Sequence, residues 1–254
     1  MFMRDSLDRL VRRRGVRLVR EPSLGLIAGD VYLSRLMREF AFDFVFDVGA
    51  NAGQYASKLR TDVEYSGHIL SIEPIPELIP QLRHTFADDR EWSCMACALD
   101  RDESIAEFNV MEGSQFSSLL PAKADFADSF KGRTRVSRRI QVPVRRFDTV
   151  FRETQRQHRF LKPFLKLDTQ GTELRILEGA MEVLPQIPAI ELEISFATLY
   201  DSAPDFQQVF QFMADADYEL SGLFPNNYGH FPRLLEMDAV FLRRELMPPN
   251  AALR

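Results

Sequence analysis

Two acidic residues, each placed where an apolar run ends, have the spacing of a nucleoside-binding site. The first run reaches Asp47 and passes into a turn with Gly49 and Gly53. The second run ends at Glu73, about twenty residues beyond that turn. Glycine lets the backbone pass close to a ligand, and an acid after the second strand can hydrogen-bond ribose hydroxyls. The pattern therefore predicts a nucleoside-binding crevice at the edge of an α/β sheet.

The spacing of the glycines narrows the class of ligand. Asp47, Gly49 and Gly53 form a D-x-G-x-x-x-G pattern, which differs from the G-x-G-x-x-G of a dinucleotide site. The sequence also lacks the G-x-x-x-x-G-K-[ST] phosphate loop. We therefore expect a nucleoside without a pyrophosphate, and S-adenosylmethionine fits this description best.

Three acids are predicted to contact different parts of that cofactor. Glu73 has the distance from the glycine turn that is typical of a ribose-binding acid. Asp100 follows the third predicted strand, where a carboxylate can meet the adenine amino group. Asp47 is expected near the methionine end, where the ammonium and sulfonium charges favour a carboxylate or its ordered waters.

Methyl transfer from a sulfonium mainly requires that the acceptor be held in line with the S–CH₃ bond. A hydroxyl acceptor must also lose its proton, which a base within hydrogen-bond reach or a divalent cation can assist. The candidates for this step are Asp168, Glu191, Glu193, His230 and Lys166. Each has the alternative of being an ordinary polar residue, and His230 in particular lies in a loop rich in glycine and proline.

Strands and helices are predicted to alternate, which indicates a doubly wound, mostly parallel Rossmann-like α/β sheet with a terminal antiparallel pair. The predicted strands cover residues 42–48, 68–72, 92–99, 105–111, 139–144, 164–168, 189–194, 218–224 and 239–243. The predicted helices cover residues 30–40, 53–59, 76–86, 148–152, 172–184 and 206–215, with Asp30 capping the first.

These elements suggest a division into a helical N-terminal arm (residues 1–40), one domain (41–245) and a tail (246–254). Within the domain, residues 112–139 are predicted to form a loop or lid insertion, because glycine, proline, serine and basic residues replace the periodic pattern there.

Arginines cluster in two segments. The first twenty residues contain seven arginines among leucines and valines, which indicates a basic amphipathic helix. This helix either packs on its own domain or on a partner subunit, giving a homo-oligomer, or meets a membrane surface or an anionic substrate. The second cluster is either the solvated face of a lid or a site for an anionic acceptor, and consists of Arg133, Arg135, Arg138, Arg139, Arg145 and Arg146.

The composition bounds the class of protein. The chain has 254 residues, of which 45% are hydrophobic, enough for a full core. The net charge of −5 argues against a general polyanion binder, so we expect no nucleic-acid partner. No segment approaches the ~18 apolar residues of a membrane span, and we expect a cytoplasmic protein.

Cys94 and Cys97 would lie on opposite faces of a strand, which fits neither a disulfide nor a metal pair.

From about residue 44 to 243, the sequence resembles the FkbM family of class I S-adenosylmethionine-dependent methyltransferases. The resemblance implies the class I methyltransferase fold and O-methylation of hydroxyls on sugars, polyketides or similar small molecules. It also implies that Asn51, Tyr55 and Ser118 contribute to cofactor binding. The segments that carry it are Val45–Tyr55, Ile72–Glu77, Ser117–Leu119, Leu165–Glu173, Leu177–Ala180 and Asp238–Phe241.

One position departs from the family pattern. Asp168, Gly171 and Glu173 match the family's D-x-E-G-x-E, but Gln170 replaces the acid between them. If that acid binds a metal or the acceptor in the family, its role is altered in this chain. We therefore predict no metal ligand and expect a metal-free site.

Two other functions compete with a small-molecule O-methyltransferase. A nucleic-acid methyltransferase is opposed by the acidic composition and by the absence of a [DN]-P-P-[YFW] motif after the fourth central strand. A cofactor-binding module without turnover is the other alternative, which the cofactor motifs alone do not separate from an enzyme. The glycine spacing disfavours a nicotinamide dehydrogenase.

Overall fold

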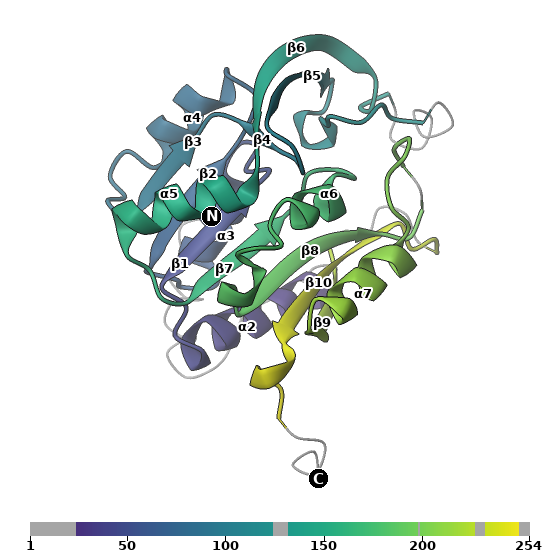
Figure 1. Ribbon diagram of the computed structural model, residues 1–254. Coiled ribbons are helices and arrows are strands. Elements are labelled where there is room, and N and C mark those ends of the chain that lie inside the picture. Colours follow the sequence, from purple (N-terminus) through teal and green to yellow (C-terminus); the bar gives the residue numbers. More distant parts are fainter. Residues whose placement is uncertain (1–23, 124–131, 198, 227–231, 249–254) are drawn as a thin grey trace.

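The computed structural model describes residues 24–123, 132–197, 199–226 and 232–248. Within these ranges, the larger sheet has seven strands in the order β3-β2-β1-β7-β8-β10-β9. Figure 1 shows helices on both faces of this sheet. Its strands are β1 (Phe44–Val48), β2 (His68–Ile72), β3 (Trp92–Met95), β7 (Pro163–Leu167), β8 (Ala189–Ser195), β9 (Tyr218–Pro225) and β10 (Glu236–Arg243).

The predicted doubly wound, mostly parallel sheet is confirmed. β1 pairs in parallel with both β2 and β7, and β8 continues outward from β7. The strand order therefore changes direction between β1 and β7. At the other edge, β10 inserts antiparallel between β8 and β9, as expected for the terminal pair. Ligands of such sheets bind at the carboxyl ends of the strands where the order changes direction.

Two layers of helices cover the sheet, and each layer has its own apolar core. Helices α5, α6 and α7 contribute to the cluster on one face, whereas α2, α3 and α4 contribute to the cluster on the other. Each fully buried aliphatic or aromatic side chain contributes about 1.5–3 kcal/mol to folding. The helices are α2 (Leu24–Glu39), α3 (Gln54–Thr61), α4 (Leu78–Thr85), α5 (Phe147–His158), α6 (Glu173–Glu178) and α7 (Phe206–Asp215).

The central strands β1 and β7 are buried along their whole length, as is typical of parallel strands covered on both faces. Each carries a single charged residue, Asp47 in β1 and Lys166 in β7, and these two are register partners. Ser71 of β2 lies beside Asp47, and Glu191 of β8 lies beside Lys166. Four neighbouring strands therefore place a buried polar row at one level of the sheet.

Helix α2 differs from the prediction, which began the helix at Asp30. The helix starts at Leu24, so Asp30 is an internal residue and not its N-cap. Leu33 and Leu36 are buried in the core, and the ring of Tyr32 lies 4.9 Å from that of Phe224 in β9. Residues 24–39 therefore pack with the sheet, unlike the separate arm expected up to residue 40. The arginine-rich residues 1–23 lie outside the described residues.

The predicted strand 92–99 is divided between two sheets. Its first half is β3 of the main sheet, whereas Ala98–Leu99 form β4 of a three-stranded sheet. That sheet has the order β4-β6-β5, with β5 at Ser104–Met111 and β6 at Val136–Arg145. In Figure 1 it curves above α6. The expected insertion 112–139 thus contains the start of β6 and the short helix η2 (Ser114–Phe116), while residues 124–131 lie outside the described residues.

Helices α5 and α6 also differ from their predicted lengths. α5 extends to His158 because its apolar face continues, with Val150, Phe151 and Thr154 buried. α6 ends at Glu178, and the residue after it must be small because a Cβ atom at Gly179 would lie 2.8 Å from the carbonyl oxygen of Asp100. None of the described helices is both long and apolar enough to span a membrane.

Candidate active site

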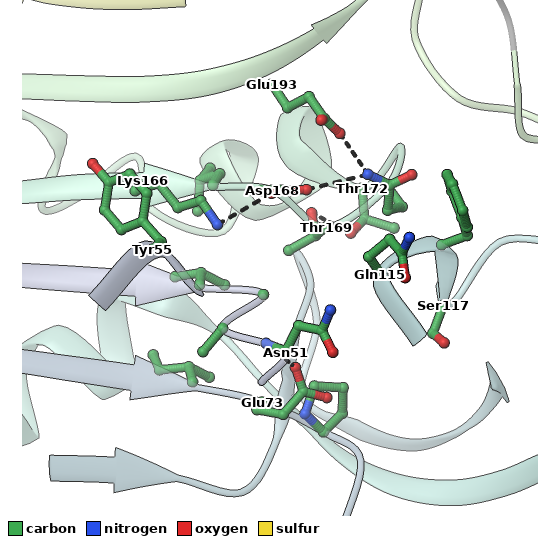
Figure 2. Close-up of a pocket in the computed structure, with 18 of the residues that line it drawn as sticks. Asn51, Tyr55, Glu73, Gln115, Ser117, Lys166, Asp168, Thr169, Thr172 and Glu193 are labelled. Atoms are coloured by element: carbon green, nitrogen blue, oxygen red, sulfur yellow. Dashed lines mark hydrogen bonds and ion pairs between the residues drawn. The ribbon is translucent and has the colours of Figure 1, made fainter. Parts of the chain in front are cut away.

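A cavity of about 760 Å³ lies at the carboxyl ends of β1, β2, β7 and β8. Figure 2 shows lining residues from the turns after these strands and from η2. Strand β10 also contributes to the lining. The cavity thus occupies the edge where the strand order changes direction. Its volume lies within the range of ~300–1,000 Å³ that is usual for ligand pockets.

The turn after β1 requires its two glycines. Gly49 has φ +78°, and a Cβ atom there would lie 1.8 Å from the carbonyl oxygen of Asp168. Gly53 has φ +83°, and its Cβ atom would lie 2.7 Å from the ring of Phe86. Only glycine therefore lets β1 and β7 approach this closely while the turn opens toward the cavity.

Glu73 closes this turn from the end of β2. Its Oε2 accepts a hydrogen bond of 2.7 Å from the backbone N–H of Asn51, and its Oε1 accepts one of 2.8 Å from that of Ile75. Burial raises the pKa of this carboxyl to about 7, although the two backbone donors oppose the rise. Each carboxylate oxygen has a second lone pair, so both can accept further hydrogen bonds from a ligand in the cavity.

The opposite wall is largely apolar and is joined to the β1 turn. The hydroxyl of Ser114 in η2 donates a hydrogen bond of 2.8 Å to the side-chain carbonyl of Asn51. Leu99, Phe108 and Phe116 line the cavity beside this contact. Between these apolar side chains and Glu73, the cavity offers an apolar wall for a planar base and a polar edge for its sugar.

Lys166 is the buried cation of the site. Its Nζ lies 3.5 Å from Oδ1 of Asp47 and 3.3 Å from Oδ2 of Asp168 (Figure 2). Burial lowers the pKa of this ammonium, but the carboxylates of Asp168, Asp47 and Glu191 outweigh it, so the pKa lies above its ordinary value. Lys166 therefore stays protonated and orients the two aspartates, and it is no proton acceptor.

Asp47 lies behind the cavity rather than in its lining. Its side chain is fully buried, and its Oδ2 accepts a hydrogen bond of 3.0 Å from the hydroxyl of Ser71. The indole N–H of Trp92 donates in turn to Ser71. Burial raises the pKa of Asp47, while Lys166 and Ser71 lower it. In this structure Asp47 supports Lys166, in place of the expected position beside the methionine end of the cofactor.

The turn after β7 is organised by Glu173. Its Oε1 accepts a hydrogen bond of 2.7 Å from the backbone N–H of Thr169, and its Oε2 accepts one of 3.0 Å from that of Gly171. This buried carboxylate therefore folds the segment that carries Asp168 and Gln170. Gly171, with φ +102°, completes the turn.

Gln170 places its amide between two carboxylates. Its Nε2 donates to Oδ1 of Asp168 at 3.2 Å and also to Oε2 of Glu193 (Figure 2). Its Oε1 accepts a hydrogen bond of 2.8 Å from the hydroxyl of Tyr200. The residue that departs from the family pattern thus supplies two N–H donors where an acid would add a third carboxylate.

More carboxyls surround Glu193 than the sequence indicated. Glu236 and Asp238 of β10 line the same end of the cavity, and Asp238 is the register partner of Glu193. Burial, followed by the neighbouring carboxylates, raises the pKa of Glu236 to about 8 and that of Asp238 to about 7. Burial and the same kind of repulsion raise the pKa of Glu193 well above its ordinary value. Within the described residues, no group of histidine, cysteine or acidic residues has the geometry of a metal site.

The structure brings most of the predicted site residues together. Those that line the cavity are Gly49, Asn51, Tyr55, Glu73, Lys166, Asp168, Glu191 and Glu193. The hydroxyl of Tyr55 donates to Glu191, so this tyrosine faces the acidic end of the cavity. Gly53 shapes the turn from behind the lining, and His230 lies outside the described residues.

Asp100 and Ser118 have other partners than the expected cofactor. The Asp100 carboxylate is held by both Nε and Nη2 of Arg175, with the first contact at 2.8 Å, and lies outside the lining of the cavity. The hydroxyl of Ser118 donates a hydrogen bond of 2.8 Å to the backbone carbonyl of Gln170. Its neighbour Ser117 lines the cavity instead.

The second arginine cluster does not form one surface for an anion. Four of its members pair with carboxylates, which neutralises them: Arg138 with Glu77, Arg139 with Glu107, Arg145 with Glu153 and Arg146 with Asp148. Arg133 alone of the cluster lines the cavity, with its guanidinium 5.3 Å from the centre of the Phe116 ring. This cluster therefore gives little support to the prediction of an anionic acceptor.

The sequence missed Glu236 and Asn226, which line the cavity, and Tyr200, which donates a hydrogen bond to Gln170 without lining the cavity. Glu236 and Asp238 alternate on one face of β10, but that face reaches the cavity only because β10 inserts beside β8. The signal for them was the i, i+2 spacing of two acids in an otherwise apolar strand, a pattern that needs the strand order to be interpreted.

The chain is similar to a known protein family and to solved structures. A family model described as "Methyltransferase FkbM domain" matches residues 47–220. Methyltransferase FkbM from Methylobacillus flagellatus KT shares 16% identity with a TM-score of 0.51, over 79% of this chain and 43% of that chain. This chain thus spans less than half of that protein's length.

Other solved structures are more distant. Magnesium protoporphyrin IX methyltransferase from Synechocystis PCC 6803 has 9% identity and a TM-score of 0.45, over 95% of both chains. An rRNA methylase from Streptococcus thermophilus has 9% identity and a TM-score of 0.45, over 89% of this chain and 98% of that one. No curated protein sequence matches the chain significantly. Because the family model covers more than half of the sequence, the chain belongs to the FkbM methyltransferase family.

Proposed function

We propose that this protein transfers a methyl group from S-adenosylmethionine to a hydroxyl group of a small molecule. Membership of a methyltransferase family supports the reaction class. The pair Gly49 and Glu73 supports the assignment of the cofactor. Gly49 lies in a turn that a Cβ atom would block, and this turn faces the buried carboxylate of Glu73, which has free lone pairs. These features suit a nucleoside without phosphates.

The two ends of the cavity differ in chemistry, and each would hold a different part of the cofactor. Glu73 would accept hydrogen bonds from the ribose hydroxyls, and Leu99, Phe108 and Phe116 would contact the adenine ring. The methionine end would then extend past Gly49 toward Asp168, where the acidic side chains gather. When bound, the cofactor supplies an electrophilic methyl group on a sulfonium.

Asp168 is the general base in this proposal. Its side chain is about one-third exposed, and Lys166 and Gln170 contact one oxygen each, which fixes the carboxylate orientation. In the transfer, the acceptor oxygen would displace S-adenosylhomocysteine from the methyl carbon, and Asp168 would accept the proton of the acceptor hydroxyl. The products are a methyl ether and S-adenosylhomocysteine.

Calorimetry tests the cofactor assignment. We expect S-adenosylmethionine and S-adenosylhomocysteine to bind, and NAD to bind more weakly or not at all. Glu73→Ala should reduce affinity for both, because hydrogen bonds to a charged acceptor are worth about 1.5–3 kcal/mol each. Glu77→Ala, an exposed carboxylate just beyond the same strand, is the control and should bind as the wild type does. An unchanged affinity in Glu73→Ala would remove this residue from the site.

Screening hydroxylated small molecules with labelled cofactor tests the transfer itself. Product analysis should find the label on oxygen. A protein that binds the cofactor tightly yet labels no acceptor would instead fit a binding module. Labelled RNA or DNA would indicate the competing nucleic-acid function, which the net charge of −5 and the acidic cavity oppose.

A further inference from the structure

One end of the cavity is lined by more carboxyl groups than basic side chains. Among the described residues, five carboxyls line it, and the basic residues that line the whole cavity are Lys58, Lys166 and Arg133. Glu193 comes from β8 and Glu236 from β10, so the acids converge from neighbouring strands rather than from one segment. The five are Asp168, Glu191, Glu193, Glu236 and Asp238.

Most of these carboxyls already have donors. Tyr55 donates to Glu191, and Lys166 lies 3.3 Å from Asp168. Glu193 accepts at both oxygens, from Gln170 at one and from Asn226 at the other, with the second bond at 2.8 Å. The donors around this cluster are therefore N–H and O–H groups of the protein.

Glu236 differs from the other four carboxyls because, in the part of the chain that the structure describes, one of its oxygens is buried without a donor. Its side chain is only 7% exposed and lines the cavity, yet its Oε1 has no hydrogen-bond partner among the described residues. A buried carboxylate oxygen without a donor costs about 1–3 kcal/mol or more. A group that is retained at such a cost and faces a ligand cavity points to a donor that arrives with the ligand.

The surroundings decide the chemistry of that donor. An anionic group would meet further carboxylates and be repelled. A metal ion needs several free oxygens, whereas both oxygens of Glu193 face amide N–H groups. A protonated amine supplies both N–H donors and the positive charge that the cluster lacks.

We propose that the methyl acceptor carries a protonated amino group as well as the hydroxyl that is methylated, and that Glu236 binds this ammonium. The acceptor class is thus an amino sugar or a similar amino alcohol. This inference rests on the proposed function, since it takes the acidic end of the cavity as the acceptor subsite. It replaces the anionic acceptor that the arginine cluster suggested.

Three sugars of one ring size test the charge preference. The protein is saturated with S-adenosylhomocysteine, so that the cofactor's own charges are present throughout, and is titrated with glucosamine, glucose and glucuronate near neutral pH. We expect glucosamine to bind at least tenfold more tightly than glucose, and glucuronate to bind most weakly, in calorimetry or in shifts of the unfolding temperature. Equal behaviour of all three sugars, including no binding by any, contradicts the proposal.

A pair of variants assigns the effect to Glu236. Glu236→Gln keeps the side-chain shape and should remove the preference for glucosamine while leaving the affinity for S-adenosylhomocysteine unchanged. Glu219→Gln removes the same charge from an exposed position of β9 and should keep the preference. A preference that persists in Glu236→Gln excludes this residue as the ammonium site.

Failure of the cofactor assignment is recognised separately. If S-adenosylhomocysteine does not bind, the proposed function fails, and the sugars are then titrated into the cofactor-free protein. A preference for glucosamine that depends on Glu236 would still support the cationic subsite, and its absence would overturn the inference.

Discussion

Lys166 in β7 and Asp168, two residues later in the turn after β7, have different chemical roles. The ammonium of Lys166 is buried between Asp47 and Asp168, whereas the Asp168 side chain reaches the cavity. Asp168→Asn keeps the shape and removes the proton acceptor. We expect it to lower the transfer rate by about 10²-fold or more with little change in cofactor affinity. Single-turnover rates with labelled cofactor measure this, and a fully active variant would exclude Asp168 as the base.

Gln170 explains how Asp168 and Glu193 can lie so close together. Its amide donates to both carboxylates, so Gln170→Glu removes two donors and adds a third acid. The free energy of unfolding should fall by about 1–3 kcal/mol near neutral pH. Magnesium or calcium should restore part of it, because three carboxylates form an oxygen-rich cation site.

Urea denaturation with and without the cation measures this change. Gln211→Glu, on the exposed face of α7, makes the same substitution next to an acid and should change stability by less than about 0.5 kcal/mol. A Gln170→Glu protein as stable as the wild type would show that the amide does not separate the two carboxylates.

Among the elements, the turn after β1 is the one whose sequence most directly determined the site. Gly49 is required because its φ is positive and because the carbonyl of Asp168 lies against it. Gly49→Ala should lower both stability and cofactor affinity, since positive φ alone costs about 1–3 kcal/mol and the strands must also separate. Gly132→Ala is the matched control, because φ is +80° there but the nearest atom is 3.4 Å away, on the flexible Arg135.

Unfolding and calorimetry of both variants separate backbone strain from the steric effect. Both should show the strain, but only Gly49→Ala should lose the cofactor. Equal losses in the two variants would mean that the close approach of β1 to β7 is unimportant for binding.

Strands could be predicted from the sequence where a short apolar run is bounded by turn residues. β1, β2 and β7 are mostly apolar runs that end in a turn, and the structure has them within a residue or two of the predicted bounds. The run 92–99 is equally apolar, but nothing in it indicates that the chain leaves one sheet for another after Met95. That division depends on pairing of β4 with β6, about 45 residues away, which is a tertiary effect.

The same limit applies to the site. Glu73 and Asp168, which line the cavity, could be located because strand ends can be predicted from the sequence, whereas Asp47 lies behind the lining. The partner of Asp100 could not be located in this way, since Arg175 follows 75 residues later on another element. Glu236 was missed because its burial depends on where β10 inserts in the sheet. Non-local contacts therefore decide which acids line the cavity.

For the whole molecule, the buried acids predict an unusual dependence of stability on pH. Burial raises the pKa of Glu236 to about 8 and the pKa values of Glu73 and Asp238 to about 7. These groups bind protons more tightly in the folded protein than in the unfolded chain. Their stabilising contribution is therefore complete below the ordinary carboxyl pKa and is lost as the pH rises through about 7 to 8.

His68 has the opposite effect but in a lower range of pH. Burial and the neighbouring His158 ring, with centroids 4.1 Å apart, lower the pKa of His68 below its ordinary value of 6.5. The folded protein therefore resists protonation of His68, and stability is lost as the pH falls below 6.5. As the pH rises about one unit above that value, His68 becomes neutral in both states and its slope vanishes, which leaves the carboxyls to be measured at higher pH.

We therefore expect the free energy of unfolding of the ligand-free protein to fall between about pH 6.5 and pH 8.5. Glu236→Gln carries no titrating group at this position, so its stability should exceed that of the wild type at the upper end and should vary less with pH. Urea denaturation across this range measures both curves, with Glu219→Gln as a control that should parallel the wild type. A stability that rises with pH, or a Glu236→Gln curve parallel to the wild type, would show that Glu236 does not titrate as a buried acid. Saturation with glucosamine should reduce the dependence of wild-type stability on pH, because a bound ammonium stabilises the deprotonated form of Glu236 that high pH favours.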